Sequence, residues 1–212
     1  MMEYPDYTGP APHDTLAAWG ESIAAGTPTP GGGSAAAVAT ALAAGLAGMV
    51  ARLAASKASL SDAGHFHSIA AEADELRAEA LRLAEEDWKA VSAVFKVMAL
   101  PRTTPEAKGQ RQAALEKAWA DAATVPMQLV RVAARVALLT RQAAEGGHRN
   151  SWGDAVVGAM LAAASAHSAS LMLELDLQGW SGGSSAEALI AEAKQYAADA
   201  AAEAVRLRGG TG

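Results

Sequence analysis

Apolar residues recur at helical spacing along most of the chain. In residues 13–25 they fall three or four positions apart, which predicts a short first helix. A longer apolar stripe predicts a helix from Ser61 or Asp62 to about Met98. Its expected inward positions are Ile69, Leu76, Leu83, Trp88, Val91, Phe95 and Met98.

The segment from Ala35 to Ala51 contains no charged residue. A membrane span needs about 20 apolar residues, so a span is one interpretation of this segment. The segment is mostly alanine and glycine, however, and helices that are apolar on all sides also occupy the centres of bundles. We therefore expect a buried central helix here, with Ser34 as its N-terminal cap.

Start and stop signals divide the second half of the chain. Thr104, Pro105 and Glu106 combine a capping residue, a first-turn proline and a first-turn acid, which predicts a helix start. This helix should be kinked or divided at Pro126 and should end before Gly146.

Two further helices follow. The first is expected from about Ser151 to Leu177, and Ser184 with Glu187 predicts a capping box for the last. We expect one domain over residues 13–208, with residues 1–12 as a flexible tail and 209–212 as a frayed end.

Helical segments joined by short loops, without a convincing strand, predict an all-α fold. The expected architecture is an antiparallel up-and-down bundle of five to six helices. An α-solenoid is less well supported, because no repeat of suitable period recurs. Apolar residues make up 51% of the chain but aromatic residues only 5%, so an alanine-rich core gains little from burial. A second subunit covering apolar faces is therefore expected.

Composition also limits the function. The net charge of -6 argues against nucleic-acid binding. Without cysteine there is no thiol nucleophile or thiolate metal site, and the scattered histidines do not predict a metal site either. The N-terminal residues lack the pattern of a signal peptide, which is compatible with a cytoplasmic, non-membrane protein.

A glycine-rich loop, Thr27-Pro28-Thr29-Pro30-Gly31-Gly32-Gly33-Ser34, precedes the expected central helix. Glycines let a backbone approach a ligand closely, and a helix start offers free N–H groups to an anion. The spacing does not match a nucleotide-binding fingerprint. A purely structural tight turn is the alternative.

This loop resembles the signature of the cyclodeaminase and cyclohydrolase family of folate enzymes, whose members have a similar proline, triple-glycine and serine loop before an alanine-rich helix. The resemblance covers nearly the whole chain. Its further landmarks are Asp87 with Ala90 and Val91, Leu100-Pro101, the segment 122–126, and Asn150 to Asp154.

The resemblance implies a homodimeric helical bundle that acts on the carbon bridging nitrogens 5 and 10 of tetrahydrofolate. A tetrahydrofolate derivative would be the ligand, with no metal and no cofactor beyond this substrate. Two reactions are open. Methenyltetrahydrofolate cyclohydrolase hydrolyses 5,10-methenyltetrahydrofolate to 10-formyltetrahydrofolate, and formiminotetrahydrofolate cyclodeaminase releases ammonia. A diverged, non-catalytic folate-binding or scaffold protein is the third possibility.

Three residues are candidates for the chemistry. Asp154 matches an aspartate of the family and could move protons, or could simply complement a helix dipole. Asp87 would need a partner if it faced inward and would be solvated if it faced outward. Lys57 could bind the glutamate tail of a folate or lie free at a helix end.

The substrate-binding residues that we expect are those of the loop, the asparagine before Asp154 and a tryptophan that could stack on a pterin. They are Pro30, Gly31, Gly32, Gly33, Ser34, Asn150 and Trp152.

Four positions depart from the family pattern. Gly153 stands where the family usually has a serine, and Val156 where it has a glycine. Met172 and Asp176 stand where we expect asparagines. These changes bear on the substrate and on catalysis, and they leave the fold prediction intact.

Overall fold

A computed structural model describes residues 7–147, 149–178, 180 and 182–210. Over these residues the chain is helical and carries no strand, which confirms the all-α prediction. The elements are α1 (Leu16–Ala24), α2 (Gly32–Ala55), α3 (Leu60–Met98), α4 (Pro105–Ala122), α5 (Thr124–Glu145), the short 3₁₀ turn η1 (Arg149–Ser151), α6 (Trp152–Leu177) and α7 (Ser184–Gly209).

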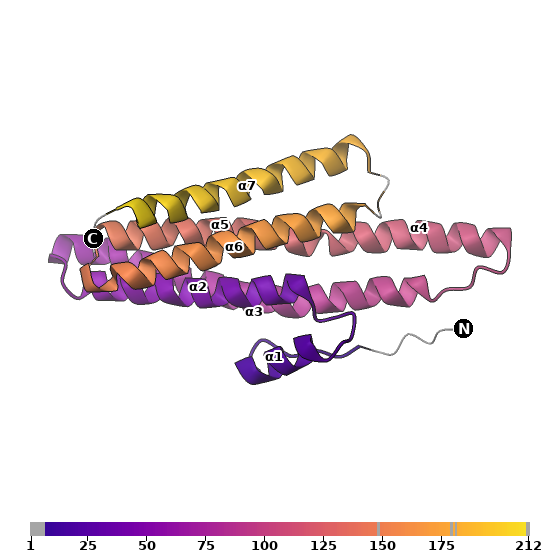
Figure 1. Ribbon diagram of the computed structural model, residues 1–212, viewed down its shortest axis with the longest axis horizontal. Coiled ribbons are helices and arrows are strands. Elements are labelled where there is room, and N and C mark those ends of the chain that lie inside the picture. The colour runs from indigo at the N-terminus through magenta and orange to yellow at the C-terminus, as the bar shows by residue number, and fades with distance from the viewer. Residues whose placement is uncertain (1–6, 148, 179, 181, 211–212) are drawn as a thin grey trace.

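The long helices form an antiparallel up-and-down bundle. The chain reverses direction between α2 and α3, between α3 and α4, between α5 and α6, and between α6 and α7 (Figure 1). Helices α4 and α5 run in the same direction (Figure 1). The distal part of α3 and α4 project together beyond the other helices, and α1 lies on the outside (Figure 1). The predicted topology is thus confirmed.

Helix α2 is central, since it packs against α3, α5 and α6. Its buried residues are almost all alanine and glycine, so neighbouring helices can approach closely. By length and composition alone, α2, the α4–α5 pair and the stretch from η1 through α6 could each cross a membrane. In the bundle 61%, 67% and 50% of their most apolar windows are buried against other helices.

The predicted fourth helix is divided, as its proline suggested. The break falls at Ala123, and Pro126 is the third residue of α5. Proline fits the first turn of a helix, where its missing N–H costs no hydrogen bond, so the new helix begins just before it. Thr104 caps α4 as predicted, accepting a hydrogen bond from the Ala107 N–H at 3.1 Å. Helix α5 ends at Glu145.

Two predicted caps are wrong. Helix α2 begins at Gly32 after Gly31, so Ser34 lies inside the first turn and its hydroxyl is used elsewhere. The capping box at Ser184 does not form; Gly183, with a φ of 53°, occupies the cap position and Ser184 is the first helical residue. A positive φ suits glycine, which explains why the turn ends there.

The chain ends are partly ordered. Residues 7–12 have no regular structure, but Trp88 Nε1 donates a hydrogen bond to the Pro10 carbonyl oxygen at 3.1 Å. This part of the expected flexible tail is therefore held against α3. Gly209 ends α7, whereas residues 1–6 and 211–212 of the predicted tail and frayed end lie outside the described residues.

Candidate functional site

The glycine loop lies against the C-terminal half of α3. The Thr29 side chain is 2% exposed, and its hydroxyl donates to the Trp88 carbonyl oxygen at 3.4 Å. Pro30 is buried and Gly31 caps α2. The loop is therefore part of the packed structure, and the N-terminus of α2 is directed at the neighbouring residue of α3, Asp87.

Asp87 faces inward. Its exposed fraction is 8%, and the Ser34 hydroxyl donates to Asp87 Oδ2 at 2.7 Å. Burial raises the pKa of Asp87, and hydrogen bonds from the hydroxyl and backbone of Ser34 lower it in part. Of the two possibilities that the sequence left open for this acid, the structure shows the buried one with a partner.

The third glycine of the loop is required by this carboxylate. A Cβ atom at Gly33 would lie 2.6 Å from Asp87 Cγ and 2.9 Å from Asp87 Oδ2. A side chain at this position would force the carboxylate to move. Gly33 therefore lets the start of α2 approach the carboxylate, and this approach gives at least one of the three glycines a physical reason.

A second buried carboxyl group, Asp176 on α6, is also 8% exposed. Burial, and secondarily the negative charge of Asp87, raises the pKa of Asp176 to about 7. The sequence analysis treated Asp176 only as a departure from the family pattern. Its position in the run Leu171-Met172-Leu173-Glu174-Leu175-Asp176-Leu177, an acid among leucines on a helix, is the signal that could have identified it.

Both carboxyl groups line one cavity of about 250 Å³ between α2, α3, α4 and α6. The lining residues are Pro28, Thr29, Gly31, Gly32, Gly33, Asp87, Val91, Trp119, Met172, Leu175 and Asp176. We call this space the glycine-loop cavity. It combines an apolar wall, one aromatic ring and two acids, which is the composition of a small-molecule site.

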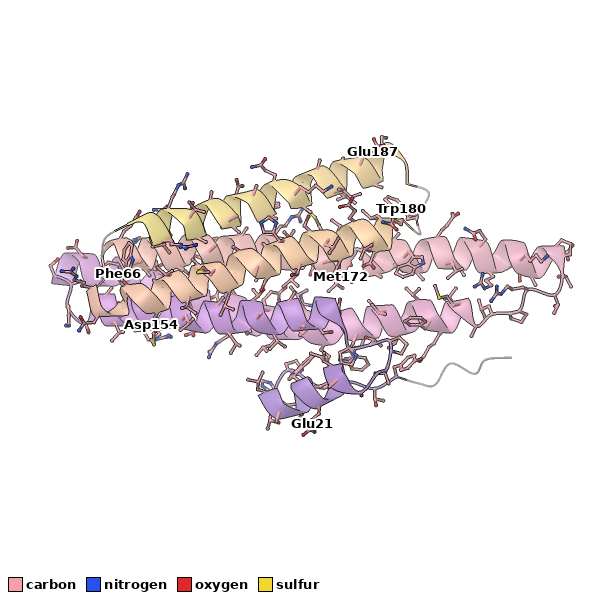
Figure 2. All side chains as sticks on the ribbon, viewed as in Figure 1. Glu21, Phe66, Asp154, Met172, Trp180 and Glu187 are labelled. Carbon is pink, nitrogen blue, oxygen red and sulfur yellow. The ribbon has the colours of Figure 1, made fainter. Side chains whose placement is uncertain are left out.

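The other predicted catalytic residues lie elsewhere. Lys57, Asn150 and Asp154 are exposed and border a shallow cavity of about 200 Å³ with Leu53 and Ser151. Asp154 is in the first turn of α6, at the opposite end from Met172 (Figure 2). Asp154 and Asp176 are 22 positions apart on α6, which at about 1.5 Å per residue separates them by about 33 Å. Within one chain, the predicted site therefore consists of two separate groups.

Trp152 is half-buried and packs against the core. A Cβ atom at Gly210 would lie 2.7 Å from Trp152 Cζ2, so the indole lies close to the end of α7. The aromatic residue that lines the glycine-loop cavity is instead Trp119 of α4, which the sequence analysis did not select.

Among the described residues no group of three or more histidine or acidic side chains is arranged to hold a metal ion. A larger cavity of about 330 Å³ lies between α5 and α7, and Arg131, Arg135 and Arg206 border it. Each of these guanidinium groups is ion-paired with a glutamate, so their charges are largely compensated.

Comparisons with known proteins agree on one family. The model of the formiminotransferase-cyclodeaminase family matches residues 15–195. A methenyltetrahydrofolate cyclohydrolase of Methylorubrum extorquens is 31% identical over 193 residues, which are 91% of this chain and 93% of that protein. The crystal structure of a formiminotetrahydrofolate cyclodeaminase from Thermotoga maritima matches with a TM-score of 0.82 and 25% identity, over 92% of this chain and 94% of that one. The chain belongs to the formiminotransferase-cyclodeaminase family.

Proposed function

We propose that this protein is a methenyltetrahydrofolate cyclohydrolase, which adds water to 5,10-methenyltetrahydrofolate and forms 10-formyltetrahydrofolate. The observation that carries the proposal is the buried Asp87 carboxylate, held by Ser34 at the edge of the glycine-loop cavity. The Methylorubrum relative, matched over nearly its whole length, bears the name of this activity.

The cavity suits the charge of this substrate. The methenyl carbon shares a positive charge with the two nitrogens, and a carboxylate beside an apolar wall stabilises such a cation more strongly than one in water. In the proposed reaction Asp87 also takes a proton from the attacking water. The apolar wall and the Trp119 ring offer a surface for a flat pterin. As proposed, the reaction needs no cofactor beyond its substrate.

Formiminotetrahydrofolate cyclodeaminase is the second candidate, supported by the Thermotoga structure of that name. In that reaction nitrogen 10 attacks the formimino carbon and ammonia leaves. The same buried carboxylate could serve both reactions, because both pass through a tetrahedral carbon. A protein of this fold without turnover is the third candidate.

We further propose that the protein is a homodimer. Large apolar side chains lie exposed along α2 and α6, two helices that pack side by side. They are Leu42, Met49, Leu53, Val157, Met160, Leu171 and Leu175. Monomeric proteins rarely leave such an extended apolar face uncovered, and a second copy offers the same face.

The dimer offers a role for the residues at the distant end of α6. In a two-fold pairing with antiparallel helices, the Asp154 and Lys57 of one copy would come beside the glycine-loop cavity of the other. Their proposed part in substrate binding and proton transfer depends on this pairing, because one chain alone keeps Asp154 about 33 Å from Asp176.

The deciding experiment is the loss of 5,10-methenyltetrahydrofolate absorbance, corrected for spontaneous hydrolysis. A rate that increases with enzyme concentration, and falls at least 100-fold in Asp87→Asn, supports the cyclohydrolase. Ammonia release from formiminotetrahydrofolate, without acceleration of hydrolysis, supports the cyclodeaminase instead. Inactivity toward both substrates contradicts the cyclohydrolase and the cyclodeaminase assignments alike.

A further inference from the structure

Asp176 is a buried acid with no compensating cation. It is 8% exposed, and within the part of the chain that the structure describes no hydrogen bond or ion pair reaches its carboxyl group. Ionised acids are rarely buried without a partner, because the desolvation cost is several kcal/mol. A carboxyl group at this position therefore does not stabilise the packing of α6.

The cavity shared by Asp176 and Asp87 gives the two acids different surroundings. Asp87 accepts the Ser34 hydroxyl and lies at the N-terminus of α2, where a negative charge is favoured. Asp176 has no such partner, and the like charge of Asp87 disfavours its ionised form. The remaining lining side chains, from α2, α3, α4 and α6, are uncharged. We expect these surroundings to favour the negative charge on Asp87 and the proton on Asp176.

We propose that Asp176 is the general acid of the glycine-loop cavity, working opposite Asp87 as the base. The inference rests on the proposed function and deepens it. Two carboxyl groups whose surroundings separate their protonation states are a recurrent arrangement for acid and base roles at neutral pH.

Water and the two carboxyl groups supply every proton that the proposed reaction moves. Water oxygen bonds to the methenyl carbon as Asp87 takes one water proton, which gives a neutral carbinol between nitrogens 5 and 10. The bond from this carbon to nitrogen 5 then breaks, its electron pair stays on nitrogen 5, and Asp176 donates the proton. The carbinol hydroxyl becomes the formyl carbonyl as its proton passes to the Asp176 carboxylate. Asp87 returns its proton to solvent, so one proton is released per turnover.

The resemblance noted in the sequence predicts asparagine at this position. An asparagine can donate a hydrogen bond but cannot release a proton at neutral pH. Asp176→Asn is therefore a test that preserves size and removes only the acid. Glu174→Gln is the matched control, since Glu174 is two residues away and pairs with Lys194 of α7 at 3.1 Å.

The experiment measures kcat, KM and the pH profile of methenyltetrahydrofolate hydrolysis for the three proteins. We expect kcat to fall at least 100-fold in Asp176→Asn with KM within threefold, and to be unchanged in Glu174→Gln. In the unmodified enzyme kcat should decline as the pH rises through about 7, and this decline should be absent from the residual activity of Asp176→Asn.

Other outcomes are equally informative. An active enzyme whose Asp176→Asn variant keeps kcat within threefold, with the same pH profile, overturns the inference and leaves the proposed function standing. If that variant does not fold, the profile of the unmodified enzyme decides, because a kcat constant from pH 6 to 9 also overturns it. Inactivity of the unmodified protein toward both folates overturns the proposed function together with the inference.

Discussion

Gly33→Ala tests the core of the candidate site. The added methyl group would lie 2.6 Å from Asp87 Cγ, so the carboxylate has to move away from Ser34. A hydrogen bond to a charged group contributes about 1.5–3 kcal/mol. Alanine is the better helix former, which offsets at most about 1 kcal/mol. We expect the free energy of unfolding to fall by about 0.5–2 kcal/mol.

Urea denaturation of Gly33→Ala beside Gly109→Ala measures this effect. Gly109 is exposed on α4 and a Cβ there meets nothing within 4 Å, so its replacement should stabilise by about 0.5–1 kcal/mol. Displacement of Asp87 should also lower kcat in Gly33→Ala by about tenfold or more. Equal stabilisation of the two variants, with full activity of both, would refute the steric argument.

A double-mutant cycle tests whether the Asp87 carboxylate is the group that opposes the added methyl. In an Asp87→Ala background the carboxylate is gone, so only the helix-propensity gain of at most about 1 kcal/mol remains for Gly33→Ala. The difference between the two backgrounds should be about 1.5–3 kcal/mol, within the range for residues in contact. An equal cost in both backgrounds would mean that a group other than Asp87 opposes the methyl.

Three further outcomes are expected. Asp87→Asn and Asp154→Asn chains, each inactive alone, should regain about a quarter of the activity when unfolded together and refolded as mixed dimers; no recovery above either parent contradicts a site shared between copies. Asp176→Asn should be more stable than the unmodified protein at pH 8 by on the order of 2 kcal/mol, with the gap closing toward pH 4. The sign follows because a pKa of Asp176 raised to about 7 makes stability fall as pH rises from 4 through 7, and urea midpoints across that range check it. Trp88→Phe should lose about 1 kcal/mol in thermal unfolding, since the Pro10 carbonyl oxygen loses its indole donor, whereas an unchanged midpoint would show that the N-terminal contact is unimportant.

Local signals in the sequence determined most of the helix boundaries. The threonine cap and first-turn proline at residues 104–105 and the glycines after residue 145 gave boundaries that the structure confirms. These signals work because capping, proline geometry and apolar spacing act within one or two helical turns. The loop sequence also indicated the family, since the order of its prolines and glycines is unusual.

Only the tertiary structure decided which residues share a cavity. Ser34 and Asp87 are 53 positions apart, and their hydrogen bond depends on the rotation and offset of α2 against α3. The same packing turned Asp176 inward and left Asp154 exposed at the far end of α6. Helical periodicity defines faces within each helix, but the pairing of those faces is set by side-chain packing between helices that are distant in sequence.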